Sequence, residues 1–301
     1  MSDILIIGAG AAGMTAALYS LRNGKSVTIV EQEGIGGQIA QSPRVENFPT
    51  IMQISGAELA DKMFEQITER GAEFKFGKVL SLHKTAEGFE AKTEFETLKA
   101  KAVIIASGVE HRKLNLKNEE ELIGHGISYC ALCDGAFYAG EDVTLIGDGN
   151  TALQYALLLS SYCKTVNVVT MHDRFFGDGA LISALGKKEN IKVTHEAKLI
   201  ELVGENELEG LIFEKKKGEK FTLKTKALFV AIGQVPNNKL YQSFVDLDER
   251  GYIIADENLA TKTEGLFVAG DCRVKKVRQL TTACSDGAIA ATSACSYLQT
   301  K

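Results

Sequence analysis

Residues 3–33 read "DILIIGAGAAGMTAALYSLRNGKSVTIVEQE", and this stretch decides the fold. A short apolar run is followed by a glycine-rich turn, a helical stretch and a second apolar run that ends at Glu31. Gly8, Gly10 and Gly13 form the G-x-G-x-x-G pattern, which allows a tight turn, a close approach of the backbone to a diphosphate, and close packing of helix on strand. Glu31 is placed to accept hydrogen bonds from a ribose diol. The stretch therefore predicts a βαβ unit that binds a dinucleotide.

The same pattern returns 139 residues later, in "DVTLIGDGNTALQYALLLSSYCKTVNVVTMHD" at 142–173. Gly147 and Gly149 correspond to Gly8 and Gly10, and Ala152 stands in the place of Gly13. Strand-like runs near 101–108 and 226–237 close the two regions, and another at 261–272 resumes the first. We therefore predict an α/β fold with two Rossmann-like dinucleotide-binding-type domains, the second inserted into the first. The expected boundaries are 1–113 and 245–301 for one domain and 114–244 for the other.

The second pattern differs from the first where its second strand ends. Thr170 takes the position of Glu31, and Met171 and His172 follow it, so neither an acid for the diol of NADH nor a basic cluster for the 2′-phosphate of NADPH is present. Arg174 is the permanent cation nearby, and Asp173 beside it partly cancels its field.

The turn of the second pattern also carries an acid, Asp148, between its two glycines, where a diphosphate would pass. Two interpretations are open. Asp148 turns to solvent and a nucleotide still binds, or the domain kept its fold and lost its ligand because a carboxylate repels a diphosphate. We favour the second.

A cysteine pair lies in "ISYCALCDGAFYAG" (127–140), where Cys130 and Cys133 are followed by Asp134. A zinc site would need two further ligands at suitable spacing, and the sequence offers none, so we predict no metal. A disulfide across so short a loop stabilises little. The spacing favours redox cycling between dithiol and disulfide, with Asp134 able to move a proton. The remaining cysteines are interpreted as small apolar residues: Cys163, Cys272, Cys284 and Cys295.

Composition excludes several classes of protein. The chain has 301 residues, a net charge of −5 and a pI near 5.7, which argues against a nucleic-acid binder. No apolar run reaches the ~20 residues of a membrane helix. Because a structural element begins at residue 3, we expect no signal peptide and a cytoplasmic protein.

Four segments carry a family resemblance: "GAGAAG" (8–13), "VENFP" (45–49), "CALCDG" (130–135) and "GDCRVKKVRQL" (270–280). With them the chain resembles the low-molecular-mass thioredoxin reductases over nearly all its length. The resemblance implies FAD as cofactor, thioredoxin as substrate and a homodimer. It also implies an inserted domain that rotates, so that the cysteine pair faces first the flavin and then thioredoxin.

The resemblance assigns roles to individual residues. Cys133 would take electrons from the flavin, Cys130 would attack the thioredoxin disulfide, and Asp134 would protonate the leaving thiolate. Asp271 would hold the ribityl chain, and Arg278 and Gln279 would lie near the isoalloxazine. The complete set of FAD-binding residues carried over is Gly8, Gly10, Ala11, Ala12, Gly13, Glu31, Gln38, Asn47, Ser107, Gly108, Gly270, Asp271, Arg278, Gln279 and Leu280.

The chain departs from the family in the inserted domain. NADPH-dependent members carry a His-Arg-Arg run and a further Arg where this sequence has Thr170, Met171, His172 and Phe176. The chain is more similar to the ferredoxin-dependent flavin thioredoxin reductases, which lack these arginines. Electron flow from a ferredoxin at about −400 mV to a thioredoxin-like disulfide at about −270 mV is downhill by roughly 6 kcal/mol. We therefore expect ferredoxin rather than NADPH as the donor.

An acidic ferredoxin needs a basic surface. Lys275, Lys276 and Arg278 are candidates for it, although a solvated face is the simpler interpretation of the two lysines, and Arg112 and Lys113 are further candidates. Three alternatives stay open. They are a thioredoxin reductase that uses NADPH or NADH through Arg174 or another basic residue, a reductase for another disulfide protein, and a non-catalytic flavoprotein that senses redox state.

Overall fold

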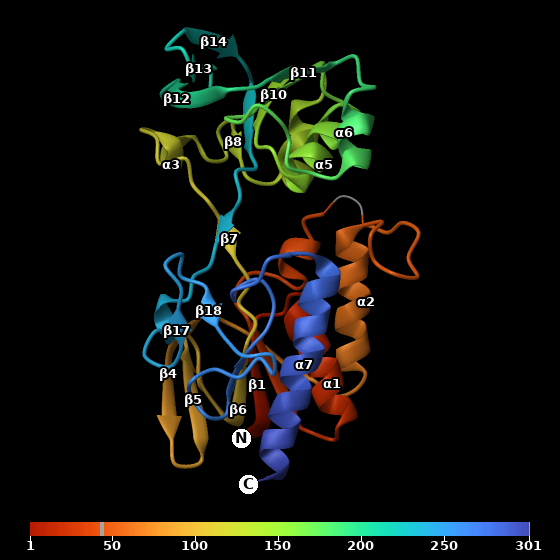
Figure 1. The fold of residues 1–301 in the computed structure, drawn as a ribbon, viewed down its shortest axis with the longest axis vertical. Coiled ribbons are helices and arrows are strands. Elements are labelled where there is room, and N and C mark those ends of the chain that lie inside the picture. The colour runs from red at the N-terminus through yellow and green to blue at the C-terminus, as the bar shows by residue number, and fades with distance from the viewer. Residues whose placement is uncertain (43–44, 301) are drawn as a thin grey trace. The chain divides into compact units, whose positions relative to one another are not determined.

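The computed structural model describes residues 1–42 and 45–300, except for the side chain of Cys133. The chain forms two compact units, Met1–Glu110 with Val235–Lys301, and His111–Gln234 (Figure 1). The first unit resumes after the second ends. The predicted α/β fold of two Rossmann-like domains, one inserted into the other, is confirmed.

The boundaries between the two units lie at other residues than the sequence predicted. The predicted boundaries were 113/114 and 244/245, whereas the structure divides the chain after Glu110 and after Gln234. Residues 235–244 belong to the first unit because Tyr241 is buried there, in one hydrophobic cluster with Val245 and Ile253. The chain passes between the units at β7 (Glu110–His111) and β16 (Gln234–Val235), and these two short strands pair with each other.

The first unit is built on a mixed sheet whose described strands run in the order β3-β2-β1-β6-β5-β4. β19 pairs with the second half of β6, beyond the end of β5. β1, β2, β3, β6 and β19 are parallel, whereas β4 and β5 form an antiparallel hairpin. The strands are β1 Ser2–Ile7, β2 Val27–Glu31, β3 Glu73–Phe76, β4 Val79–Thr85, β5 Gly88–Thr93, β6 Thr97–Ile105 and β19 Leu266–Val268, with the separate pair β17 Asp246–Leu247 and β18 Ile253–Ile254.

Alternate residues of the central strands face two different cores, as the period of a β-strand requires. Ile4 and Ile6 of β1 pack with the helices, whereas Leu5 and Ile7 pack with the β4–β5 hairpin and the segment around Tyr241. Three helices lie together beside the sheet (Figure 1). The helical segments of this unit are α1 Ala11–Arg22, α2 Gly56–Thr68 and α7 Leu280–Gln299, with 3₁₀ turns η1 Gly37–Ile39 and η3 Lys239–Tyr241.

The second unit repeats the arrangement at smaller size. Its parallel sheet has the described order β11-β10-β9-β15-β8, and an antiparallel sheet β12-β13-β14 packs against one of its faces. The helices α5 and α6 pack with the residues of the other core cluster. The elements are β8 Ile127–Ser128, β9 Asp142–Ile146, β10 Thr165–Val169, β11 Ile191–Thr194, β12 Ala197–Val203, β13 Gly210–Lys215, β14 Lys220–Lys224, β15 Ala227–Val230, α3 Glu119–Leu122, α4 Ala131–Asp134, η2 Gly135–Tyr138, α5 Asn150–Leu159 and α6 Gly179–Leu185.

The predicted repeat is confirmed in both units. β1, α1 and β2 correspond to β9, α5 and β10, and the closing strands β6, β15 and β19 lie within the ranges predicted for them or overlap them. Across the described residues, no helix combines the length and the apolar character needed to cross a bilayer.

Candidate active site

The glycine turn of the first unit joins β1 to α1, and its three glycines differ in the space around them. Gly8 has φ +109°, and a Cβ on it would lie 2.3 Å from the carbonyl oxygen of Ala106. A Cβ on Gly13 would lie 1.9 Å from the carbonyl oxygen of Gly8. A Cβ on Gly10, by contrast, would meet nothing closer than the carbonyl oxygen of Gly36 at 3.9 Å. Gly8 and Gly13 therefore form the turn, and Gly10 leaves its backbone open to a ligand.

Glu31, at the end of β2, lies beside this turn. Its carboxylate accepts the backbone N–H of Ala9 at 2.8 Å, and its other oxygen accepts the N–H groups of Gln32 and Glu33 at 2.8 and 2.9 Å. Glu31 also lines a cavity of about 250 Å³ together with Gly8 and Ser107. The structure thus brings three predicted cofactor residues to one cavity.

Sequence reasoning missed other residues that line this cavity. One group is the segment 77–80, which comprises the turn after β3 and the start of β4, and the other comprises Asn237, Leu240 and Tyr241. The sequence had assigned the second group to the inserted domain. Neither group carries a recognised motif. The signal that could have found the second group was the aromatic residue of "NNKLY", Tyr241, which packs in a core of the first unit.

The other predicted cofactor residues also belong to the first unit. Gln38 donates from Nε2 to the carbonyl of Val109 at 3.3 Å, and Asn47 donates from Nδ2 to Oε1 of Gln279 at 3.1 Å. Gln279 is the N-cap of α7, where it forms a capping box with Thr282. Gly108 has φ +63°, with open space where a Cβ would be. Ala11 and Ala12 begin α1, and Leu280 begins α7.

The Gly270–Asp271 turn follows β19. Gly270 has φ +83°, and a Cβ on it would lie 2.8 Å from the Cβ of Ala12, so the turn packs directly on the first turn of α1. Oδ1 of Asp271 is buried and has no hydrogen-bond partner among the described residues. Burial raises the pKa of this carboxyl, against the lowering effect of Lys275 and Arg278.

The predicted basic surface around residues 275–278 is wrong. The side chain of Lys275 is 6% exposed, and its ammonium lies 2.8 Å from a carboxylate oxygen of Asp286. The guanidinium of Arg278 stacks 4.1 Å from the centre of the Tyr252 ring. Of the three cations only Lys276 is exposed, so Lys275 and Arg278 no longer count toward the predicted docking surface. The solvated-face interpretation of Lys275 also fails.

The cysteine pair is held in the second unit at the start of α4. Cys130 is disulfide-bonded, and its backbone N–H donates to Oγ of Ser128 at 3.0 Å. The N–H of Asp134 donates to the carbonyl of Cys130 at 3.1 Å, and Ser128 Oγ lies 2.5 Å from Oδ2 of Asp134. Gly135 follows because a Cβ there would lie 2.2 Å from the hydroxyl of Tyr162. Ser128, which the sequence did not single out, ties the acid to the cysteine.

The side chain of Cys133 lies outside the described part of the structure. Among the described cysteines, the four away from the pair are free, and Cys163, Cys272 and Cys295 are buried in apolar clusters, as predicted. Burial raises the pKa of Cys163 and of Cys272 to about 11. Within the described residues, His, Cys, Asp and Glu form no group of three or more that could hold a metal ion.

The glycine turn of the second unit differs from the first in its charge. Nε2 of His172 lies 3.5 Å from Oδ2 of Asp148, and the N–H of Phe176 donates to the carbonyl of Asp148 at 2.7 Å. The Asp148 side chain is 32% exposed, so it neither turns fully to solvent nor leaves the turn. Arg174 lies over the Phe176 ring, with its guanidinium carbon 5.3 Å from the centroid. The segment after β10 is therefore tied to the turn.

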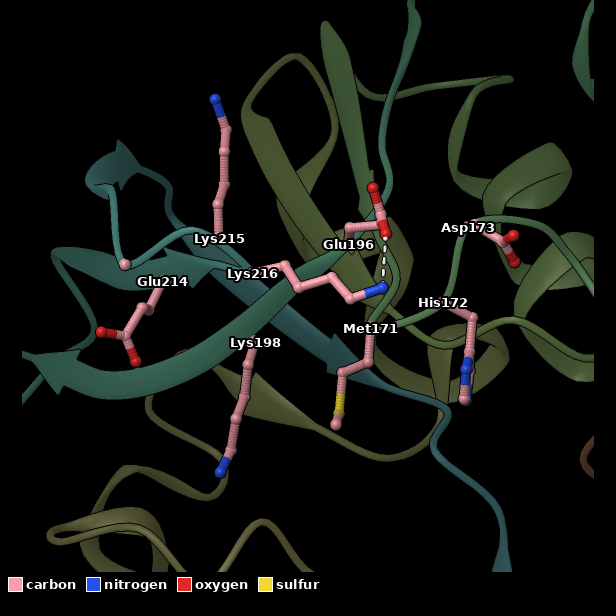
Figure 2. Close-up of a pocket in the computed structure, with 9 residues that line it drawn as sticks. Met171, His172, Asp173, Glu196, Lys198, Glu214, Lys215 and Lys216 are labelled. Atoms are coloured by element: carbon pink, nitrogen blue, oxygen red, sulfur yellow. Dashed lines mark hydrogen bonds and ion pairs between the residues drawn. The ribbon is translucent and has the colours of Figure 1, made fainter.

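A cavity of about 600 Å³ opens beyond the end of β10, between this segment and the β12–β13 strands (Figure 2). Three lysines line it, at 198, 215 and 216, and so do three carboxylates, at 173, 196 and 214. Figure 2 shows Lys216 at the carboxylate of Glu196, 3.2 Å away. The lining charges balance, so the cavity offers little net attraction to a phosphate.

Known proteins are similar to this chain in both sequence and fold. The family described as pyridine nucleotide-disulphide oxidoreductase matches residues 2–287. A thioredoxin reductase of Bacillus subtilis is 37% identical, covering 99% of this chain and 95% of that protein. The crystal structure of Lactococcus lactis thioredoxin reductase matches with a TM-score of 0.97 at 33% identity and covers all of both chains. The chain belongs to the thioredoxin reductase family.

A ferredoxin-flavin thioredoxin reductase of Clostridium acetobutylicum is also similar, at 30% identity and a TM-score of 0.55, covering 99% of this chain and 98% of that one. The thioredoxin reductase family uses FAD. Two observations show that the first unit fits this cofactor. The backbone at Gly10 is open to a diphosphate, and the buried Oδ1 of Asp271 can accept a hydrogen bond from a hydroxyl group.

Proposed function

We propose that the chain is an FAD-dependent reductase of the thioredoxin disulfide, acting through Cys130 and Cys133. The observation that carries the proposal is the hydrogen-bonded group of the second unit, in which a disulfide-bonded Cys130 is tied through Ser128 to the carboxylate of Asp134. Membership of the thioredoxin reductase family supports the choice of substrate.

The residues act in a balanced exchange. In the reduced pair the Cys130 thiolate forms a bond to one sulfur of thioredoxin, and the disulfide of thioredoxin breaks. Asp134 gives a proton to the leaving thiolate. Cys133 then loses its proton and attacks the Cys130 sulfur, and the bond between Cys130 and thioredoxin breaks. The second thiolate of thioredoxin takes up that proton, so thioredoxin leaves as a dithiol and the enzyme returns to its disulfide. When bound, FAD supplies a group that accepts electrons singly and passes them on in pairs.

Ser128 has one hydroxyl hydrogen and two acceptors within reach, Oδ2 of Asp134 at 2.5 Å and the carbonyl of Cys130 at 3.2 Å. The shorter contact, to a carboxylate, is the stronger one. Ser128 therefore acts as a positioning residue: it keeps the acid one helical turn from Cys130 while its oxygen accepts the Cys130 N–H.

Ferredoxin is the donor that we propose. The residues at the end of β10, Thr170, Met171 and His172, carry no permanent positive charge, and Asp148 places a carboxylate in the glycine turn. The balanced charges of the 600 Å³ cavity support the same conclusion. The similar Clostridium acetobutylicum protein is named a ferredoxin-flavin thioredoxin reductase, which supports ferredoxin as the donor. Its TM-score of 0.55 is lower than the 0.97 of the Lactococcus lactis enzyme.

A nicotinamide nucleotide is the second candidate donor, and Lys198 favours it. Lys198 lines the cavity, and its ammonium has no ion-pair partner among the described residues. It could serve a phosphate group in place of the arginines that the family's NADPH users carry. In that case Lys198→Ala would slow reduction of the flavin by NADPH.

Anaerobic stopped-flow separates the donors. The purified protein is mixed with reduced ferredoxin or with a tenfold excess of NADPH or NADH, and the flavin absorbance is followed. We expect rapid bleaching by ferredoxin alone. Rapid bleaching by NADPH rejects the ferredoxin proposal and leaves the reductase intact.

A second experiment tests the reductase itself. Thioredoxin reduction is assayed with Cys133→Ser and, as a matched control, Cys163→Ser, which changes a buried free cysteine of the same unit. We expect the first variant to lose activity and the second to keep it. Activity in Cys133→Ser would reject the dithiol relay, and a protein that binds FAD but reduces no disulfide would be the redox sensor. We also propose a homodimer, which light scattering tests.

A further inference from the structure

Five charged residues gather in the first unit where the turn after β19 meets α7. They are Asp271, Arg273, Lys275, Arg278 and Asp286. Three are cations and two are acids, so the group carries one excess positive charge. The side chains of Lys275 and Asp286 are 6% and 5% exposed. Burying a charge costs free energy unless the charge is paired and hydrogen-bonded. The stability of the group therefore depends on the hydrogen bonds of Asp286, Lys275 and Asp271.

Asp286 is the centre of this charged group. It accepts the backbone N–H of Gly270 at 3.1 Å, Nε of Arg273 at 2.9 Å and the ammonium of Lys275 at 2.8 Å, and its second oxygen accepts Nη2 of Arg273 at 2.7 Å. Burial acts to raise the pKa of Asp286, but the hydrogen bonds from Arg273 and Lys275 outweigh it and leave the pKa below its usual value. Asp286 is therefore an ionised and fully bonded carboxylate.

Lys275 and Asp271 are not satisfied in the same way. The ammonium of Lys275 has three hydrogens, and the bond to Asp286 uses one. It lies 3.9 Å from Oδ1 of Asp271, which is too far for a hydrogen bond. That oxygen is buried and has no hydrogen-bond partner in the described part of the chain, and the same is true of Nε of Arg278 in this group. The Lys275 ammonium can therefore donate further hydrogen bonds, and Oδ1 of Asp271 beside it can accept them. Both lie on the segment whose Gly270 packs against the start of α1.

We propose that Lys275 is a further FAD-binding residue, and that Asp286, which does not touch the cofactor, holds it in place. The inference rests on the proposed function. Lys275 and Asp271 supply a donor and an acceptor about one hydroxyl group apart, which suits the polyol chain of FAD. The excess positive charge of the group also favours an anionic cofactor over a neutral one.

Affinity for FAD tests the inference without any use of activity. Apoprotein is prepared from the wild type, Lys275→Met and Lys276→Met, and FAD is titrated while its fluorescence is followed. Lys276 is the matched control because it neighbours Lys275 and is exposed. We expect Lys275→Met to weaken FAD binding at least tenfold and Lys276→Met to change it less than twofold. Asp286→Asn should weaken binding in the same direction as Lys275→Met.

A purely structural ion pair predicts a different result. In that case Lys275→Met would lower the melting temperature of the apoprotein while FAD affinity stayed within twofold of the wild type, which overturns the inference. If Lys275→Met does not fold, Asp286→Asn, which removes the carboxylate that holds the Lys275 ammonium, is titrated instead, and unchanged FAD affinity in that variant overturns the inference. Failure of the wild-type apoprotein to bind FAD would instead reject the proposed function.

Discussion

At the scale of single residues, the site depends on polar atoms that the sequence pattern does not mark. "CALCDG" identifies the cysteines and the acid, but Ser128, two residues before Cys130, is the group that links them. A serine two residues before a cysteine is common and carries no signal of its own. It becomes informative only when the first turn of α4 brings Asp134 back to it.

Substitution of Ser128 by alanine tests this link. We expect Ser128→Ala to slow thioredoxin reduction about fivefold, because loss of one hydrogen bond costs about 1 kcal/mol. Ser161→Ala is the control, since that exposed hydroxyl donates only to the carbonyl of Leu158 in the same unit. In an Asp134→Asn background Ser128→Ala should have little further effect. Additive losses would show that Ser128 acts independently of Asp134.

Cys272 predicts how stability depends on pH. Burial raises the pKa of its thiol from 9.0 to about 11. Above pH 9 the unfolded chain releases the proton first, so the folded state loses stability as the pH rises from about 9 to 11, by roughly 2 kcal/mol for this group. We expect Cys272→Ala to lose less stability than the wild type between pH 8 and pH 10.5 in urea unfolding. Ser296→Ala serves as control, and parallel losses in all three proteins would contradict the assignment.

At the scale of elements, the two glycine turns show why one position differs between the repeats. In the first unit a Cβ on Gly13 would overlap the carbonyl oxygen of Gly8 at 1.9 Å. In the second unit Ala152 occupies the equivalent position and is fully buried. The first helix therefore lies closer to its turn, which agrees with a turn that receives a ligand.

An exchange of these two residues makes the contrast measurable. Gly13→Ala should destabilise the first unit by about 2 to 3 kcal/mol, because the backbone must move to make room. Ala152→Gly should cost only about 1 kcal/mol, the helix propensity of glycine. FAD content after gel filtration and urea unfolding followed by flavin fluorescence would report both. Equal losses in the two variants would contradict this steric explanation.

The sequence predicted best those strands and helices that a motif of neighbouring residues marks. The G-x-G-x-x-G turn and its repeat located β1, α1, β9 and α5, because the spacing of the glycines along the sequence marks where a strand turns into a helix. The boundary at 244/245 failed because burial of Tyr241 is a long-range contact with residues such as Ile253. The basic surface failed for the same reason, since Asp286 lies on α7, eleven residues beyond Lys275.

At the scale of the whole molecule, the question is which donor this family member accepts. The net charge of −5 disfavours an acidic ferredoxin at long range, so a local basic surface has to outweigh it. Of the five cations predicted for this role, Lys275 is buried, Lys113 is paired with Glu120 and Arg278 is half-buried against Tyr252. Lys276 and Arg112 are the two that are exposed. Lys276 belongs to the first unit and Arg112 to the second. Because so few predicted cations are exposed, added salt should weaken ferredoxin binding only modestly.

Adding positive charge after β10 tests whether the absence of basic residues there prevents the use of NADPH. The variant Asp148→Ala/Met171→Arg/His172→Arg/Phe176→Arg removes the carboxylate at the turn and supplies three cations, two of them at positions that line the 600 Å³ cavity and one beside the turn. We expect NADPH to bleach the flavin of this variant at least tenfold faster than that of the wild type, with a smaller gain for NADH, which lacks the 2′-phosphate. Ferredoxin-driven reduction should not fall, since none of these residues belongs to its proposed docking cations and the variant is less negative overall. Equal rates with NADPH before and after the change would mean that charge at these four positions does not decide the donor.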